Sequence, residues 1–400
     1  CFEVLSWQTF TPAIQIGDLM EFEVSQFSGM KDGEVIGGQD NYYGSTFLYI
    51  VGKGIVPWYT ENTGELVQGV TSHQEHYQED SRELPEEYRL GGDTTVPYQY
   101  THEPDNSFMQ MALNIDYDKS QKFLEGRRVF HSNFTDGQHD EFTDNGTFTD
   151  VTNLIGAHHV NESCSGCHIR NGGSRVEANG VALDRWIFKI GDSSGAPDAN
   201  RGRVIQPSNT NGNGNGEGTV SIAQWTENSD GLRTPTFTFS SGQPAQFSAR
   251  ISPRLVGLGL LEAITETDIL ALEQAQASSN DGVSGRANLV IDPKNPALTR
   301  IGRFGWKAGT VSVEHQVAGA LNTDMGVKTS LLPNLDCGSN QGDCNSAAPA
   351  LDDTNLDKLV YYVQALAVRA QRGFESGTED QSIKAGKQTF VDTGCAACHT

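Results

Sequence analysis

Two short stretches of this 400-residue chain carry the same arrangement of cysteine and histidine. They are Cys164-Ser-Gly-Cys167-His168 and Cys395-Ala-Ala-Cys398-His399. The C-x-x-C-H spacing is the signature of covalent c-type haem attachment. The two thiols add across the haem vinyl groups, and the histidine ligates the iron. The sequence therefore predicts two covalently attached c-type haems, with iron ligated by His168 and His399.

Other uses of a C-x-x-C pair have to be compared with haem attachment. Such pairs also occur in zinc sites and in thioredoxin-like redox centres. A zinc site would need the cysteines of both stretches to converge from distant parts of the chain, and it would give the two histidines no role. A redox centre needs a compact βαβ unit, which neither stretch shows. Haem attachment gives a role to both cysteines and to the histidine of each stretch.

Each C-x-x-C-H string follows a segment with helical spacing that contains Gly-x-x-x-Phe. The first copy runs from Gly126 to Phe130 and the second from Gly386 to Phe390. Residues four apart share one helix face, so a partner helix can approach at the glycine. The pattern resembles the first helix of a cytochrome c domain, present twice. About thirty residues rich in Asp, Asn, Thr and Gly separate the first helix from Cys164, and we expect them to form a surface loop.

Composition limits the partners of the chain. The net charge of −23 disfavours nucleic acid, and it suits a basic electron-donor protein. The mean hydropathy of −0.45 is typical of a soluble chain. The longest apolar run, residues 255–264, is too short to span a bilayer, so no transmembrane segment is predicted.

The predicted haems also indicate a compartment. Covalent haem is attached outside the bacterial cytoplasm, so we expect a periplasmic or cell-surface protein. The chain starts at Cys1, which could carry a lipid anchor. It stops one residue after His399, whereas a c-type domain normally continues past its haem string. We therefore expect a second haem domain that is truncated here.

The predicted fold is mainly α, with cytochrome c-like haem domains, extensive loops and a β-rich N-terminal region. Residues 1–110 form the β-rich module of unknown role, with alternation at residues 20–24 and an apolar run at residues 47–51. Residues 118–205 form the first haem domain. Residues 206–350 connect the haem domains and contain a β hairpin around residues 236–239. Residues 351–400 contain a helix and the start of the second haem domain.

Two local features lie near the end of the chain. Cys337 and Cys344 are seven residues apart and suit a small disulfide loop. Apolar residues from Leu356 onward fall at helical spacing after Asp353 or Thr354, either of which could cap the helix.

Five strings occur in order between the haem motifs. They are Ser252-Pro-Arg254, Gly257-Leu-Gly-Leu-Leu-Glu-Ala-Ile264, Asp281-Gly-Val-Ser-Gly-Arg286, Gly302-Arg-Phe-Gly-Trp-Lys-Ala308 and Asp324-Met-Gly326. Together they resemble the bacterial di-haem oxidoreductase family, described as peroxidases or thiol oxidoreductases and similar in outline to di-haem cytochrome c peroxidases and MauG-like proteins. The resemblance covers about residues 118–400. It implies a haem-dependent, peroxidase-like enzyme that uses hydrogen peroxide and passes electrons between its haems.

The resemblance also indicates candidate site residues. The loop before Gly282 corresponds to a calcium site in the family, but residues 279–281 offer few carboxylates, so calcium is only weakly supported. Peroxide cleavage needs a proton carrier and often a cation. Glu262, within an apolar run, is the candidate carrier, or else a helix-surface residue. Arg254 or Arg303 could stabilise charge or anchor a loop.

Two further residues have both a redox and a packing interpretation. A tryptophan relays electrons between the haems of the related peroxidases, so Trp306 is the candidate relay, or else a core aromatic residue. Met325 is a candidate axial iron ligand, or else ordinary packing. Other possible sixth ligands are His131, His139, His158, His159 and His315.

Two other functions stay open at this point. The chain could be a non-catalytic electron-transfer di-haem cytochrome, with both irons ligated on both sides. Alternatively, residues 1–110 could bind a glycan or partner, with the haem portion as an accessory.

Overall fold

The computed structural model describes most of the chain between residues 85 and 399, together with the backbone of short strands between residues 19 and 55. Between residues 85 and 399 it leaves out residues 97–107, 113, 141–145, 211–215, 280, 343, 346–347 and 374–378. Cys1 and most of the expected N-terminal module lie outside the described residues. The two N-terminal strands predicted from the sequence are confirmed as β1 (Leu19–Gln26) and β4 (Tyr43–Ile50), which pair antiparallel.

The described residues contain seven α-helices. In chain order they are α1 (Tyr117–Phe130), α2 (Cys164–Cys167), α3 (Leu258–Ala263), α4 (Glu266–Ser278), α5 (Val313–Asp324), α6 (Asp353–Gln364) and α7 (Gln381–Asp392). The predicted helices before each haem string and after residue 353 are confirmed. The α6 cap is Asp352, whose carboxylate accepts a hydrogen bond from Asn355 N, so the prediction of Asp353 or Thr354 is wrong. A cap needs extended backbone, and Asp352 is the last extended residue before the helix. None of the described helices is long and apolar enough to cross a bilayer.

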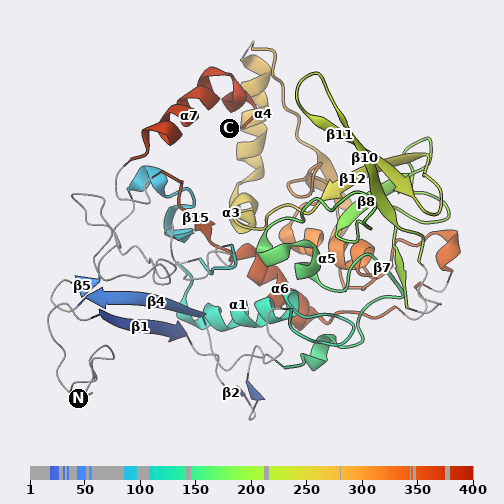
Figure 1. The fold of residues 1–400 in the computed structure, drawn as a ribbon, viewed down its shortest axis with the longest axis horizontal. Helices are drawn as coiled ribbons and strands as arrows, with labels where there is room; N and C mark the ends of the chain where they lie inside the picture. The colour runs from blue at the N-terminus through green and yellow to red at the C-terminus, as the bar shows by residue number, and fades with distance from the viewer. Residues whose placement is uncertain are drawn as a thin grey trace.

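Helices α1 and α6 lie side by side at the centre of the molecule (Figure 1). They are closest at Gly126, where a Cβ atom would lie 2.0 Å from the carbonyl oxygen of Lys358. Ion pairs flank this contact, between Lys358 and Glu125 at 2.9 Å and between Lys122 and Asp357 at 2.6 Å. The predicted approach of a partner helix at the first Gly-x-x-x-Phe string is confirmed.

One hydrophobic core forms between α1, α5 and α6. Its buried members come from each of the three segments expected after residue 118, and among them are Phe123, Phe130, Phe134, Leu255, Phe304, Leu321, Met325, Leu356, Leu359 and Tyr362. The haem segment around α1 therefore does not have a core separate from the segment around α6. Burial of this shared apolar surface holds α1 and α6 in register.

The segment between α1 and α2 is not the surface loop that the sequence predicts. Phe134 and Val151 are fully buried in it, and its backbone is paired, with Phe134 N donating to Glu162 O at 2.8 Å. The Phe134 carbonyl accepts from Leu154 N and Ile155 N at 2.9 and 3.0 Å. The few apolar residues of this polar stretch bring it into the core, which composition alone did not reveal.

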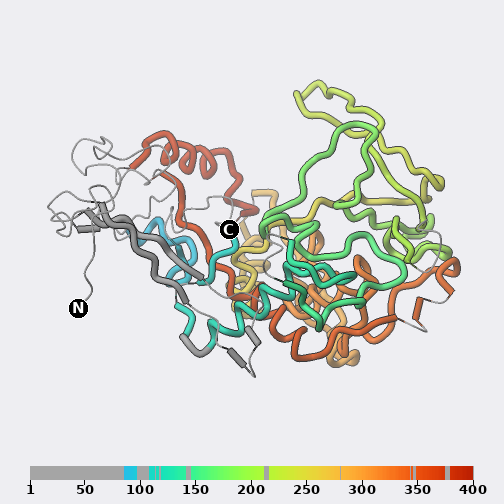
Figure 2. Tube along the Cα trace, turned by 60° about the horizontal axis from the view of Figure 1, so that its bottom comes forward, coloured from blue at the N-terminus to red at the C-terminus, as the bar shows by residue number. Residues whose placement is uncertain are grey.

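The remaining described strands pair in short sheets. They are β2 (Met30–Lys31) with β3 (Glu34–Val35), β4 with β5 (Gly54–Ile55), β6 (Thr95–Val96) with β15 (Val368–Arg369), β7 (His158–His159) with β9 (Ser208–Asn209), β8 (Trp186–Gly191) with β12 (Gln246–Ile251), β10 (Val220–Glu227) with β11 (Arg233–Phe239), and β13 (Leu289–Asp292) with β14 (Asn295–Ile301). The predicted hairpin is β10–β11, and Figure 2 shows it extending from the body of the molecule. The predicted disulfide between Cys337 and Cys344 is formed. Aromatic and aliphatic residues of β8, β10 and β11 form a second, smaller core.

Helices α3, α4 and α7 contain no buried residue. Helices α4 and α7 approach each other at their C-terminal ends, on the side of the molecule away from β1 (Figure 1). Phe390 and Val391 of α7 are 41% and 53% exposed, and Leu270 and Leu272 of α4 are 44% and 46% exposed. The second haem string follows α7 directly and therefore lies on this exposed side.

Candidate haem-binding site

The first haem string forms α2, a single helical turn. Its N-cap is Ser163, whose hydroxyl accepts a hydrogen bond from Gly166 N at 3.0 Å. His168 N donates to Cys164 O at 3.0 Å and closes the turn. This turn presents Cys164 and Cys167 together, with the imidazole directly after them. The two thiols are not joined to each other in a disulfide.

A distant segment holds the histidine of this string. His168 Nδ1 lies 2.9 Å from the carbonyl oxygen of Pro253, and since a carbonyl only accepts, Nδ1 carries the proton. The Ser252 hydroxyl donates to the carbonyl of Cys167 and accepts from Ser174 N at 2.9 Å. Residues 252–253 therefore anchor both the haem string and the imidazole. The sequence analysis noted these residues as a motif but did not assign them this role.

These contacts fit a haem ligand. A proton fixed on Nδ1 leaves the Nε2 lone pair of His168 for a metal, which is the usual arrangement of a ligating histidine. Burial lowers the pKa of His168 and favours the neutral form that ligates iron. Burial also raises the pKa values of Cys164 and Cys167 to about 12, so both are thiols at neutral pH.

The zinc alternative finds no support in the described residues. They contain no group of three or more His, Cys, Asp or Glu side chains arranged to hold one metal ion. The two cysteine pairs therefore do not converge on a common site. In the loop assigned to calcium by resemblance, the Asp281 carboxylate instead accepts hydrogen bonds from Ser279 Oγ and Val283 N, at 2.6 and 2.9 Å.

The second haem string repeats one contact of the first. The Phe390 ring of α7 lies 5.9 Å from the His399 ring, and the Phe130 ring of α1 lies 6.4 Å from the His168 ring. Each Gly-x-x-x-Phe string thus places its aromatic residue against the histidine of the following haem string. Gln276 of α4 donates to the carbonyl of Ala397 at 3.1 Å and ties the second string to α4.

Glu262 has structural hydrogen bonds at both carboxylate oxygens. Oε1 accepts from Val313 N at the start of α5, at 2.8 Å, and Oε2 accepts from Gln364 Nε2 of α6. The half-buried side chain also lines a pocket of about 330 Å³, together with Thr94, Ala112, Gly259, Leu260, Ala263, Gln364 and Leu366. Glu262 therefore faces a small cavity and at the same time joins α3 to α5 and α6.

The two arginines differ in their contacts. Arg303 donates to the carbonyls of Leu261 and Ile264 at the end of α3, which is the loop-anchoring role considered for it. Arg254 is exposed, and its guanidinium lies over the Phe108 ring at 5.2 Å from the centroid. A cation held over an aromatic face is a packing contact in this structure.

Trp306 is not a core residue, since 64% of it is exposed. Its indole Nε1 donates to the carbonyl of Ile251 at 3.0 Å, two residues before the carbonyl that holds His168. Met325 is buried in the main core, to which Cys164 also packs. The structure thus places both Trp306 and Met325 near the first haem string. Their roles as electron relay and axial ligand stay predictions.

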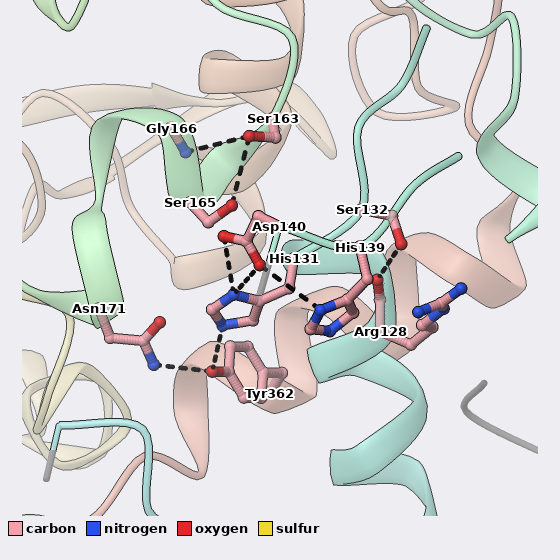
Figure 3. A network of polar contacts seen from close by, with 10 residues as sticks. All are labelled: Arg128, His131, Ser132, His139, Asp140, Ser163, Ser165, Gly166, Asn171 and Tyr362. Carbon is pink, nitrogen blue, oxygen red and sulfur yellow. Dashed lines mark hydrogen bonds and ion pairs between the residues drawn. The ribbon is translucent and has the colours of Figure 1, made fainter. Parts of the chain in front are cut away.

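Of the histidines considered as sixth ligands, His131 is already engaged at both ring nitrogens. Nδ1 lies 3.0 Å from Asp140 Oδ1, and Nε2 lies 3.3 Å from the Tyr362 hydroxyl, as Figure 3 shows. His159 Nδ1 bonds the Gly156 carbonyl at 3.0 Å. His315 Nδ1 accepts from Val311 N at 3.4 Å. His131 therefore has no ring nitrogen left for iron in this structure.

With this geometry in view, the comparison with known families can be stated. A family described as "Di-haem oxidoreductase, putative peroxidase" matches residues 241–400. Residues 241–400, less than half of the chain, are thus similar to the di-haem oxidoreductase family. No curated protein and no solved structure matches the chain. The family resemblance drawn from the sequence is confirmed, and the family name implies haem cofactors and oxidoreductase chemistry.

The matched stretch contains the second haem string but begins after the first. The structure nevertheless links them, because Pro253 and Ser252 lie in the matched stretch and hold His168 and Cys167. The site around the first string is thus built by the family region and by the segment that precedes it.

Proposed function

We propose that this chain is a peroxidase-like di-haem c-type oxidoreductase that reduces hydrogen peroxide with electrons from a partner. Cys164 and Cys167 would hold one haem and Cys395 and Cys398 the other, by thioether bonds. His168 and His399 would be the iron ligands on the protein side. The hydrogen bond from His168 Nδ1 to Pro253 is the observation that carries the proposal, because it prepares the imidazole for a metal.

When bound, the haems would supply the iron that reacts with peroxide and the store of electrons. The chain would supply proton transfer and positioning. Glu262 is the proposed proton carrier, since its side chain lines a cavity of about 330 Å³, which is large enough for a small substrate. Trp306 is the proposed electron relay, since its indole Nε1 donates to the carbonyl of Ile251, the last residue of β12 and two residues before Pro253.

The haem assignment is tested on protein made in a host that matures c-type cytochromes. After denaturation, haem should stay on the chain and stain with it. Substitution of Cys164 and Cys167 by Ala should remove one of two equivalents, and the Cys395 and Cys398 pair the other. A colourless chain, or colour lost on denaturation, would refute the proposal.

Catalysis is tested at Glu262. Substitution Glu262→Gln keeps the hydrogen bond from Val313 N but removes the acid–base group, so peroxide turnover should fall roughly a hundredfold or more with haem content unchanged. The matched control is Glu266→Gln, because Glu266 pairs with Arg300 at 2.8 Å and does not line the cavity. Equal turnover in both variants would remove Glu262 from the mechanism.

One observation favours the alternative of a non-catalytic electron-transfer cytochrome. Both oxygens of Glu262 already bond to Val313 and Gln364, which is a structural use of this carboxylate. Spectra decide between the two functions: two six-coordinate low-spin haems with no response to peroxide support electron transfer alone, whereas a high-spin fraction supports the peroxidase.

We further propose that the protein works in the periplasm or at the cell surface, where c-type haems are attached. A basic electron-donor protein suits its net charge of −23.

A further inference from the structure

A buried polar chain lies beside the first haem string and has no role in the peroxide chemistry above. It runs from Asp140 through His131 and Tyr362 to Asn171 (Figure 3). His131 and Tyr362 are 1% and 0% exposed. Tyr362 comes from α6, His131 from the end of α1, Asp140 from the loop before the haem string, and Asn171 from the short 3-10 helix (Ile169–Asn171) after it. Asp140 also lies beside Ser165, within the string itself (Figure 3).

The donors and acceptors of this chain place its protons when His131 is the neutral tautomer with its proton on Nδ1. Burial acts to raise the pKa of Asp140, but the hydrogen bonds from His131 and Ser165 act against it, and the pKa is lowered to about 2. The carboxylate is therefore ionised and accepts from His131 Nδ1–H. Asn171 Nδ2 donates to the Tyr362 oxygen at 2.8 Å, and with the His131 proton on Nδ1, Nε2 is the acceptor for the phenol O–H at 3.3 Å.

Aromatic rings connect this chain to the haem string. The Tyr362 ring lies 5.3 Å from the Phe130 ring, and the Phe130 ring lies 6.4 Å from the His168 ring. Asn171 N also donates to the His168 carbonyl at 2.9 Å. Tyr362 is thus one aromatic residue removed from the imidazole that we assign to the first haem.

A buried phenol is a difficult electron donor unless its proton leaves with the electron, because a buried radical cation would be strongly destabilised. Here the proton has an acceptor in hydrogen-bond contact. The imidazolium that forms on His131 would be paired with the Asp140 carboxylate at 3.0 Å. Arg127, Arg128 and His139, which lie near this site, are cationic or neutral, and Cys164 is a neutral thiol, so Asp140 supplies the negative charge beside His131.

We propose that Tyr362 is a redox-active tyrosine that gives one electron to the first haem after hydrogen peroxide has oxidised the protein. The phenol O–H bond breaks, the electron goes to the haem at Cys164 and Cys167, and the proton moves to His131 Nε2. The products on the chain are a neutral tyrosyl radical and an imidazolium paired with Asp140. This inference rests on the proposed peroxidase function.

The experiment uses the haem-loaded full chain, mixed with hydrogen peroxide and frozen within milliseconds for electron paramagnetic resonance. The unmodified protein should give a tyrosyl signal that narrows when the protein contains ring-deuterated tyrosine. In Tyr362→Phe the signal should fall at least about tenfold. The matched control is Tyr361→Phe, the half-buried neighbour on α6 whose ring lies under Lys122, and it should keep the full signal.

The role of the proton acceptor has its own measurement. In His131→Gln the radical should form roughly a hundredfold more slowly, as expected when a positioned base is removed. A second readout needs no variant and so does not depend on how the variants fold. In the unmodified protein, high-field spectra should show the reduced g value of a hydrogen-bonded tyrosyl radical, together with one exchangeable proton coupling that disappears in D₂O.

The outcomes separate this inference from the proposed function. If peroxide changes the haem spectrum but Tyr362→Phe keeps the tyrosyl signal, the peroxidase function stands and the role of Tyr362 is refuted. A signal without the exchangeable proton coupling would also refute it. If no haem is attached or peroxide leaves its spectrum unchanged, the proposed function fails, and the inference fails with it.

Discussion

The contact between α1 and α6 at Gly126 allows one prediction to be worked through in detail. In Gly126→Ala the new methyl group would lie 2.0 Å from the Lys358 carbonyl oxygen and 2.8 Å from Tyr362 Cβ. The first of these atoms is backbone, so no side-chain rotation relieves the overlap. Helix α6 would have to move away from α1, and the shared core between them would lose close packing.

Two opposing effects determine how much Gly126→Ala changes the free energy of unfolding. Alanine is a better helix former than glycine by about 1 kcal/mol in a helix interior. Overpacking a well-packed core costs about 1–3 kcal/mol, and a clash with backbone belongs at the upper end of that range. We therefore expect Gly126→Ala to lower the free energy of unfolding by about 2 kcal/mol.

The second Gly-x-x-x-Phe string provides a matched control. Gly386 lies in the interior of α7, and a Cβ atom there would meet none of the described residues within 4 Å. Gly386→Ala should therefore gain up to about 1 kcal/mol from helix propensity alone. Chemical denaturation of the haem-loaded protein measures both variants. A change of the same sign in the two, or a stabilised Gly126→Ala protein, would show that the described packing of α1 on α6 is wrong.

Two further predictions concern the half-buried Glu217 and the Ser252 contact that holds the first haem string. Burial raises the pKa of Glu217 from 4.5 to about 7, so the folded state binds the carboxyl proton more tightly than the unfolded state does. The free energy of unfolding should therefore fall by on the order of 1 kcal/mol as the pH rises from 4.5 through 7. Denaturation curves at pH 5 and pH 8 should show that Glu217→Gln reduces this pH-dependent loss of stability. An unchanged loss would show that Glu217 is not its source. Ser252→Ala leaves Ser174 N without its acceptor and should cost about 1–2 kcal/mol. Ser248→Ala, in the strand β12 that ends just before Ser252, is the control, and an equal loss in both variants would show that the Ser252 hydroxyl does not hold this segment.

The sequence correctly predicted those structural features that depend on the spacing of residues close together in the chain. The two C-x-x-C-H strings, the Gly-x-x-x-Phe helices and the helix that begins near residue 353 could each be predicted from spacing alone. Gly126 also indicated that a partner helix could approach there, although not which one, because a small residue on the helix face leaves room for close contact. The disulfide of Cys337 and Cys344 was predictable for the same reason, since its two residues are neighbours along the chain.

Contacts between residues far apart in the sequence could not be predicted from local spacing. His168 and Pro253 are 85 residues apart, and Asn171 and Tyr362 are 191 residues apart. Nothing in the spacing of either pair indicates that they meet. The stretch between α1 and α2 shows the same difficulty, because its polar composition predicts a solvated loop whereas the burial of Phe134 depends on partners elsewhere in the chain.

The surroundings of the two haem strings differ in a way that bears on function. The first string is held by the Pro253 and Ser252 contacts and by a buried network, whereas Cys395 and His399 are exposed. If His168 ligates iron as proposed, its firmly held imidazole would fix the ligand field, and the buried surroundings would control proton access. These are the conditions under which a nearby phenol can give up an electron and a proton together. The structure therefore favours the first haem as the partner of Tyr362, and the radical experiment tests that assignment directly.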